Sequence, residues 1–362
     1  MSSETRGTAT AGQGLGRRGL ASGRYGPPLL VKAGRLVFSV ALTFLGLTFV
    51  TFLIGRVIPI DPVVAIVGNR ATAEVYERTR LELGLDRPLY EQYWIYLTST
   101  LQGDFGRSVL TSRPVLEDIV RFFPATLELA TVATLIGVLL GVPMGVLAAV
   151  KRGRWPDHLI RVFGLVGYSV PVFWLGLVGL LVFYAQLGWV AGPGRLDIYY
   201  DDIVPTVSGL ILLDALLVWD LEVFGNALSH LVLPAGILGY FSLAYIARMT
   251  RSFMLDQLGQ EYIITARVKG LSEARVVWRH AFGCILVPLI TVIALSYAYL
   301  LEGAVLTETV FAWPGLGRYI TQSLFNADMN AVLGGTIVVG SCFIGLNLLS
   351  DLLYQVVDPR AR

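Results

Sequence analysis

The stretch EYIITARVKGLSEARVVWRH, residues 261–280, places seven charged or ionisable side chains between two long apolar segments. Each charge would cost about 2.5–3.5 kcal/mol at the centre of a bilayer, so the stretch predicts an aqueous loop between two membrane spans. Ile263, Ala266, Arg267 and Gly270 recur at i, i+3, i+4 and i+7, which predicts a short helix. Gly270 can adopt the left-handed conformation that ends one helix before a second begins.

The composition of the whole chain agrees with a membrane protein. Of the 362 residues, 55% are hydrophobic and only 15% are charged, whereas a soluble domain carries about 25% charged residues. The mean hydropathy of +0.66 predicts a polytopic membrane protein. The net charge of +2 does not favour a nucleic-acid partner, and Cys284 and Cys342 have no spacing typical of a disulfide framework or metal site.

Six segments are long and apolar enough to cross a bilayer, which takes about 20 residues. They are residues 36–54, 126–150, 159–187, 231–247, 285–307 and 332–353. The third segment is interrupted by Pro171, which predicts a break in that span. Residues 1–35 are rich in Gly, Ser, Thr and Arg and resemble no secretory signal, so we expect a disordered cytoplasmic tail.

Two polar regions separate these segments. Residues 59–124 predict an ordered insertion, and residues 188–229 form an acidic region that contains the apolar run 207–219. Asp214 interrupts that run, which favours an amphipathic helix on the membrane or on a partner over a further span. Lys and Arg concentrate in the tail, the 151–154 turn, the charged loop and the C-terminus, so the positive-inside rule predicts that both termini are cytoplasmic.

Motifs that carry catalysis are absent from the sequence. None of the three lysines (Lys32, Lys151, Lys269) belongs to a Walker A motif, and HExxH, paired CxxC and GxSxG are missing. The chain is therefore expected to be neither an ATPase nor another enzyme.

Several long motifs resemble one family. They are TARVKGLSEARVVWRHA (265–281), LGLDRPLYEQYWIYL (83–97), GDFGRS (103–108), RPVLEDI (113–119), FPATLELA (123–130), VPVFWLGL (170–177), LGW (187–189), HLVLPA (230–235), ETVFAWPGLGR (308–318) and DLLYQVVDPR (351–360). Across residues 36–360 the sequence resembles the first, B-type permease subunit of bacterial dipeptide, oligopeptide and nickel ABC importers. It departs at Gly283-Cys284, where the family commonly has Arg-Asn.

The resemblance implies an all-α fold of six transmembrane helices, of the type I ABC importer permease kind. Residues 36–362 would form the permease domain in the bacterial cytoplasmic membrane, with extracytoplasmic regions at 59–124 and 188–229. The implied partners are a second homologous permease subunit, one or two cytoplasmic ATPase subunits that bind ATP and Mg, and an extracytoplasmic substrate-binding protein. No cofactor is expected on this chain.

The resemblance also implies that the loop 252–282 is a coupling loop, which docks in a groove on a cytoplasmic ATPase. The expected docking residues are Glu261, Tyr262, Ile263, Thr265, Ala266, Arg267, Lys269, Gly270 and Leu271. We expect Tyr262, Ile263, Ala266 and Leu271 to bury apolar surface in the groove, and Arg267 and Lys269 to pair with acidic groove edges. The alternative is an ordinary solvated amphipathic loop.

Residues for a translocation pathway are suggested by the third and fifth spans. Ser169, Pro171 and Trp174 lie at the break in the third span, where irregular backbone is tolerated beside a cavity. Glu302 is an acid within the fifth span and by default a functional candidate. The alternatives are a proline kink that serves packing, and a Glu302 that lies near the outer boundary within reach of water.

The expected substrate is a short peptide, with nickel chelates, haem and glutathione as alternatives within the same architecture. A proton-coupled secondary transporter is the alternative from another class. The scarcity of acids within the spans and the lack of an inverted repeat count against it.

Overall fold

The computed structural model describes residues 29–57, 61–68, 70–200 and 207–357. The chain forms two compact units, Met1–Ser39 and Val40–Arg362. Of the first unit, only the start of helix α1 (Leu29–Val57) is described. The expected disordered tail therefore falls mostly outside the described residues, except that its last residues are already helical. All contacts discussed below lie within the second unit.

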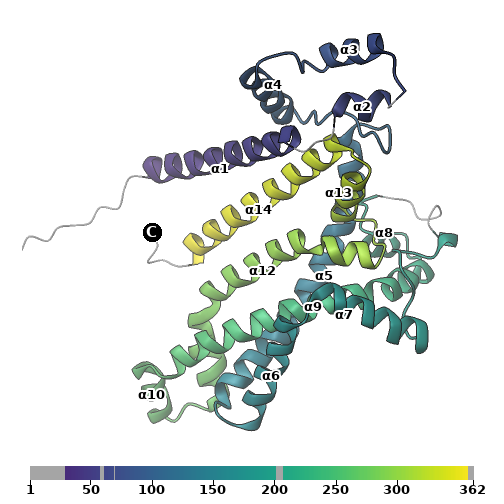
Figure 1. The fold of residues 1–362 in the computed structure, drawn as a ribbon. Helices are drawn as coiled ribbons and strands as arrows, with labels where there is room; N and C mark the ends of the chain where they lie inside the picture. The colour runs from purple at the N-terminus through teal and green to yellow at the C-terminus, as the bar shows by residue number, and fades with distance from the viewer. Residues whose placement is uncertain (1–28, 58–60, 69, 201–206, 358–362) are drawn as a thin grey trace, which may run out of the picture. The chain divides into compact units, whose positions relative to one another are not determined.

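The described chain is helical apart from loops and one isolated β-bridge between Arg107 and Pro114. Five stretches are long and apolar enough to cross a membrane: Leu36–Arg56, Val115–Val150, Leu221–Leu258, Glu273–Val310 and Met329–Ser350. A sixth is a bent pair, Trp155–Ser169 with Val172–Gln186, whose two halves meet at 97°. The predicted all-α polytopic class is confirmed (Figure 1).

The bend in the third span has a local cause. Helix α6 (Trp155–Ser169) ends at Ser169, and Val170 is extended because the residue before a proline avoids the α-helical region. Pro171 then precedes helix α7 (Val172–Gly179), which continues into a π-helical stretch, Leu180–Gln186. The break predicted at Pro171 is confirmed.

Helices α5 (Val115–Val150) and α9 (Leu221–Leu258) pack closely along each other. Their backbones approach because α5 presents glycines at the contact. A Cβ on Gly137 would lie 2.3 Å from Ser242 Oγ, and one on Gly145 would lie 2.6 Å from the carbonyl oxygen of Ala247. Small residues at such contacts are typical of membrane helices, where packing replaces the hydrophobic effect.

The two polar regions contain short helices. The insertion 59–124 holds α2 (Pro62–Val67), α3 (Ala73–Glu82) and α4 (Leu89–Leu101) before α5 begins. Helix α4 packs against α1 through 3.1 Å hydrogen bonds between the hydroxyls of Tyr93 and Thr48 and between those of Tyr96 and Thr51. The run 207–219 forms only the short helix α8 (Ile211–Leu217).

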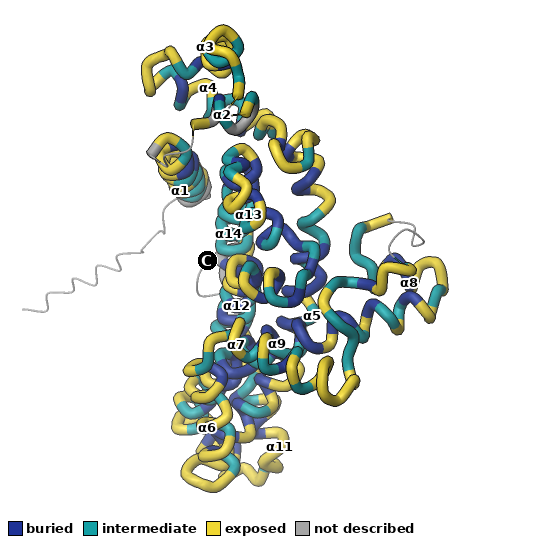
Figure 2. Tube along the Cα trace, turned by 45° about the vertical axis from the view of Figure 1, so that its right-hand side comes forward, coloured by how far each residue is buried: buried dark blue, intermediate teal, exposed yellow. Residues whose placement is uncertain are grey.

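The charged loop forms α10 (Glu261–Val268) and α11 (Glu273–Arg275), and a π-helical turn (Val276–Ala281) leads into α12 (Phe282–Val310). Helix α13 (Leu316–Phe325) and α14 (Met329–Val357) complete the chain. Within the second unit, α10 lies at the end opposite to α2, α3 and α4 (Figure 1), and Figure 2 shows the most buried residues along α5 and α9 between these ends.

Candidate functional site

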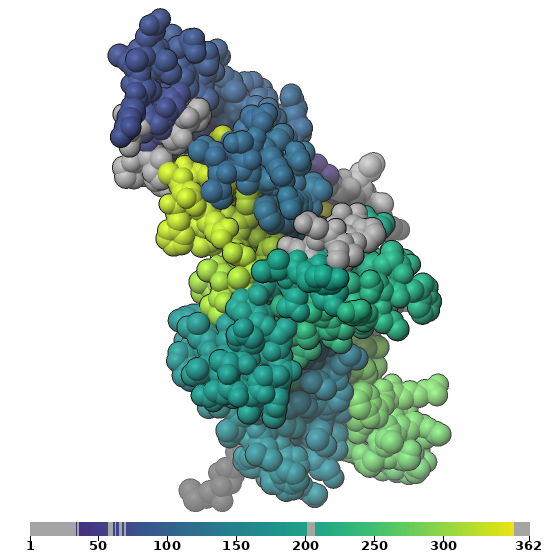
Figure 3. All heavy atoms as spheres, turned by 90° about the vertical axis from the view of Figure 1, so that its right-hand side faces the viewer, coloured from purple at the N-terminus to yellow at the C-terminus, as the bar shows by residue number. Residues whose placement is uncertain are grey.

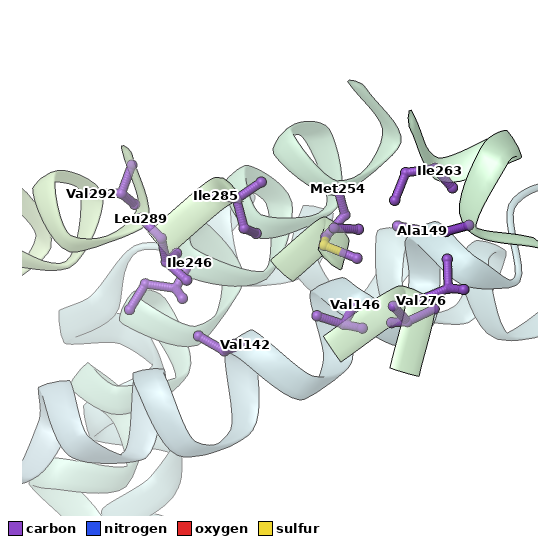
Figure 4. Packing of buried hydrophobic residues seen from close by; sticks show 13 residues of the cluster. Val142, Val146, Ala149, Ile246, Met254, Ile263, Val276, Ile285, Leu289 and Val292 are labelled. Carbon is purple, nitrogen blue, oxygen red and sulfur yellow. The ribbon is translucent and has the colours of Figure 1, made fainter. Parts of the chain in front are cut away.

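One face of α10 is fixed to the ends of the long helices. Ile263 is fully buried in an apolar cluster with Ala149 at the end of α5, Met254 near the end of α9 and Val276 before α12 (Figure 4). Burying an isoleucine side chain contributes about 1.5–3 kcal/mol. The helix is therefore attached to three membrane helices at once.

This burial corrects part of the expected docking surface. Ile263 and Ala266 are buried in the chain's own core, with exposed fractions of 0% and 7%, so neither can present apolar surface to a partner. Leu271 is partly buried against the same cluster. Only Tyr262, which is 40% exposed, keeps the expected outward position among the four apolar residues.

The outer face of α10 carries two apolar residues that the sequence analysis missed. Ile264 is 53% exposed and Val268 is 83% exposed, and they lie one turn apart at i and i+4. In Figure 3 the loop region is the light green surface at the lower right. Glu261, Thr265 and Lys269 are also exposed, as expected for docking residues. The outer face therefore combines an apolar pair with polar neighbours.

A tight turn joins α10 to α11. Gly270 has φ of +79°, which confirms the left-handed conformation predicted for it, and no atom lies within 4 Å of a Cβ built on it. Across the turn, Arg267 Nε lies 2.7 Å from Glu273 Oε1. Arg267 was expected to pair with a partner, whereas here it is held by an acid of its own loop. Because both side chains are exposed, this ion pair contributes only about 0–1 kcal/mol.

An apolar pocket of about 360 Å³ lies beside the bend in the third span. Helices α6, α7, α9 and α12 line it with aromatic and small side chains: Tyr168, Val172, Leu238, Phe241, Tyr245, Ser296, Tyr299, Leu300 and Gly303. Tyrosines combine apolar surface with a hydroxyl, so such a pocket can hold a mixed polar and apolar molecule.

The residues expected on a pathway flank this pocket but do not line it. Ser169, Pro171 and Trp174 are exposed next to the lining residues Tyr168 and Val172. Ser169 donates its hydroxyl to the carbonyl oxygen of Leu165 at 2.9 Å. Glu302 is exposed on α12 and neighbours Gly303 along the chain. A pathway role for these four residues stays a prediction.

A buried acid that the sequence analysis did not select is Glu308, which is 0% exposed. Its carboxylate accepts hydrogen bonds from Thr126 Oγ1 at 2.6 Å and from the backbone N–H of Arg318 at 2.9 Å. A Cβ on Gly315 would lie 2.3 Å from the carboxylate carbon, so only glycine leaves room for it. Glu308 thus joins α12 to α5 and α13. In the sequence, the two glycines of PGLGR (residues 314–318) were the signal that a side chain packs closely against this turn.

The region between α7 and α9 is anchored by a buried ion pair. Arg195 Nη2 lies 2.6 Å from Glu128 Oε2 on α5, with side chains 10% and 6% exposed. Burial alone would raise the pKa of Asp214, but hydrogen bonds from the Ser208 hydroxyl and from the backbone N–H groups of residues 207–209 lower it below its usual value. Glu128 Oε1 also accepts a hydrogen bond from the backbone N–H of Leu212 at 2.8 Å, which fixes α8 against α5.

Within the described ranges, no group of three or more His, Cys, Asp or Glu side chains could hold a metal ion. His230 is engaged instead with the carbonyl oxygen of Gly192 at 2.9 Å and with Asp197 at 3.3 Å.

Sequence comparison identifies the family. Residues 141–362 match the model of the binding-protein-dependent transport system inner membrane component, and residues 30–130 match the N-terminal model of the same systems. The chain belongs to this family. It is a permease, the membrane subunit of an ABC importer, and a multi-pass inner-membrane protein.

Relatives cover nearly the whole permease. It is 47% identical over 324 residues to the probable D,D-dipeptide transport system permease protein DdpB of Escherichia coli K12, covering 89% of this chain and 95% of that one. It is 43% identical over 321 residues to the di/tripeptide transport system permease protein DppB of Pseudomonas aeruginosa, covering 88% and 95%. The dipeptide permease DppB of Haemophilus influenzae is 44% identical over 327 residues, covering 90% and 97%. The B-type permease family expected from the motifs is confirmed.

A solved structure of the MetNI methionine ABC transporter in an inward-facing conformation matches 66% of the permease and 96% of that chain, with a TM-score of 0.48 and 18% identity.

Proposed function

We propose that the chain carries short peptides across the cytoplasmic membrane as one permease subunit of an ABC importer, and that α10 couples it to a cytoplasmic ATPase. The observation that carries the coupling is the division of α10 into two faces. Its inner face is buried against three spanning helices, whereas its outer face exposes Ile264 and Val268. An apolar pair one turn apart suits a helix that docks in a groove.

The fixed inner face gives this docking a mechanical consequence. Ile263 packs against the ends of α5 and α9 and against the segment before α12, so a displacement of α10 moves those ends together. ATP and Mg would act on the partner ATPases, of which one or two distinct kinds dock. A second permease subunit and an extracytoplasmic binding protein complete the proposed complex, with both termini of this chain in the cytoplasm.

The substrate class is supported by the names of the relatives, which are permeases for D,D-dipeptides, dipeptides and tripeptides. The apolar pocket beside the bend, with its tyrosines and Ser296, suits a molecule with both apolar and polar groups. Nickel chelates, haem and glutathione remain the competitors against which a peptide substrate is tested.

Replacing an outward valine tests the coupling. Val268→Asp would place a carboxylate where the partner groove is expected and would remove an apolar contact worth about 1.5 kcal/mol, or roughly tenfold in affinity. In a reconstituted complex we expect weaker ATPase association and reduced peptide uptake. The matched control is Val207→Asp, because Val207 is 70% exposed in the region between α7 and α9. Equal uptake and equal ATPase association in both variants would contradict the docking role.

The transport class is tested separately with the unaltered complex in proteoliposomes. ATP-dependent uptake of a labelled dipeptide, reduced by unlabelled peptides and not by nickel or haem, is the expected result. Uptake driven by a proton gradient in vesicles that contain this chain without ATPases would instead establish a secondary transporter.

A further inference from the structure

A second pocket, of about 370 Å³, lies between α6 and α9, nearer to α10 than the apolar pocket beside the bend. One wall is the first half of the bent span, from His158 to Tyr168, and the other is the last part of α9, from Ala244 to Arg251. We call it the basic pocket, because His158, Arg161, Arg248 and Arg251 are among the residues that line it. No carboxylate is among the residues that line it.

The cations of the basic pocket differ in what neutralises them. Arg251 forms a bidentate ion pair with Asp157, with nitrogen–oxygen distances of 2.7 and 2.9 Å. Arg161 and Arg248 are exposed, and no acid within 4 Å pairs with either in the part of the chain that the structure describes. Arg161 and Arg248 therefore line the pocket without a salt bridge to an acid of the described chain.

Arg248 is nevertheless held in position. Its guanidinium carbon lies 4.7 Å from the ring centre of Tyr168 and 5.8 Å from that of Tyr245, both within the range of a cation–π contact. Stacking on two rings orders the side chain without using its N–H donors, which stay free for an anion. The positive-inside rule accounts for cations near the membrane boundary, but it does not account for their convergence on one pocket.

The rest of the lining is hydrocarbon. Ile160, Val162 and Leu165 from α6 face Ala244 and Ala247 from α9. Leu165 is also 66% exposed on the outer surface of α6, so the aliphatic lining continues onto a helix surface that a bilayer can cover. A site with two free guanidinium groups at one part and aliphatic walls at another fits an anion that carries a hydrocarbon chain.

We propose that the basic pocket binds one anionic phospholipid, with its phosphate between Arg161 and Arg248 and an acyl chain along Val162, Leu165 and Ala244. Basic pockets between transmembrane helices are suited to such head groups. A free phosphate would use the two arginines but not the hydrocarbon walls. A substrate carboxylate would use the same arginines without requiring contact with the bilayer.

The test measures lipid retention by the complete complex. Native mass spectrometry of the complex, extracted from membranes that contain phosphatidylglycerol, is expected to show a retained anionic lipid on the unaltered protein. In Arg161→Gln/Arg248→Gln, removal of two phosphate contacts is expected to weaken retention about thirtyfold. The control Lys151→Gln/Arg152→Gln removes the same charge from the exposed turn before α6, outside the pocket, and is expected to retain the lipid. Equal retention in the two double variants would overturn the proposal.

A second variant and a second measurement guard against misfolding. Arg161→Lys/Arg248→Lys keeps both charges and is expected to retain more lipid than the glutamine pair. A photoactivatable phosphatidylglycerol is expected to label residues 158–168 or 244–251 of the unaltered protein, and labelling elsewhere alone would overturn the proposal.

The sources of the anion are separated in the same assay. Added inorganic phosphate is not expected to displace the lipid, and displacement at the level seen with a competing anionic lipid would point to a simple phosphate site. Unchanged lipid retention in Arg161→Gln/Arg248→Gln, together with lost uptake of peptides but not of their C-terminal amides, would assign the pocket to the substrate and overturn the lipid site.

Discussion

Replacing Gly315 by alanine is expected to destabilise the junction between α12 and α13. A Cβ at this position would lie 2.3 Å from both Cδ and Oε1 of Glu308 and 2.5 Å from Oε2. The carboxylate cannot rotate away without leaving Thr126 and the backbone N–H of Arg318 unpaired in a buried site. Gly315 has φ of −99°, which any residue can adopt, so the cost is steric.

The magnitude follows from three terms. Overpacking of a buried site costs about 1–3 kcal/mol. Loss of one hydrogen bond to a charged group costs about 1.5–3 kcal/mol. The lower entropy of the unfolded alanine chain offsets about 0.4–1 kcal/mol. The sum of the mid-range values is a loss of about 3.5 kcal/mol in the free energy of unfolding.

Thermal unfolding in detergent, followed by tryptophan fluorescence, measures this effect near the buried Trp313. The matched control is Gly225→Ala on α9, where an added Cβ meets nothing within 4 Å. Adding Glu308→Asp to Gly315→Ala shortens the clashing side chain and is expected to recover part of the lost stability. If Gly315→Ala unfolds at the same temperature as Gly225→Ala, the steric reasoning is refuted.

Three further predictions concern the turn between α10 and α11, the contact between α6 and α9, and the stability of the α8 region at low pH. Gly270→Ala forces a side chain into the left-handed region at a cost of about 1–2 kcal/mol. Substrate-stimulated ATPase activity and uptake should therefore both fall. The control Gly259→Ala should leave both unchanged, because Gly259 has φ of −85°. Asp157→Asn breaks the pair with the partly buried Arg251 and should cost about 1.5–3 kcal/mol in unfolding experiments; a change below measurement error would contradict that value. The pKa of Asp214 is lower in the folded chain, so its contribution to stability is present above the unfolded pKa of about 3.9 and is lost as pH falls through the folded value. The protection factors of residues 207–217, measured relative to the intrinsic exchange rate at each pH, should therefore fall in acid, and Asp214→Asn should remove that pH dependence.

Local chemistry allowed the breaks in the fold to be predicted from the sequence. Pro171 disfavours the α-helical conformation in the residue before it, Val170, so the helix ends there. Gly270 has φ of +79°, which glycine adopts without strain and its neighbours do not. Both effects depend on one or two residues. Apolar length, summed over about 20 consecutive residues, located the membrane segments.

The ends of the long helices were not predicted, because their extensions are not apolar. The segment expected at 126–150 is the helix Val115–Val150, and the one expected at 231–247 is Leu221–Leu258. Outside the apolar part, helix continuation depends on tertiary contacts such as those of Asp118 with Thr111 and Tyr319. Hydropathy carries no signal for such contacts.

The inner face of α10 was also assigned incompletely. Ile263 and Ile264 are adjacent, so the periodicity of the sequence supports two apolar stripes, one through Ala266 and one through Val268. Which stripe faces the core depends on where Ala149 and Met254 lie, more than a hundred residues apart in the chain. Glu308 was missed for the same reason, since its partner Thr126 belongs to a distant helix.

Helix α9 runs unbroken for 38 residues, from its cap at Asp220 to Gly259, even though Pro234 lies within it. At 1.5 Å per residue it is about 57 Å long. It connects the region that holds Arg195 to the loop that holds Ile263. A tilt of roughly 5° about one end displaces the other end by about 5 Å, close to the rise of one helical turn. If α9 tilts as one rigid body, a small rotation at the loop end becomes a displacement of side-chain size at the far end.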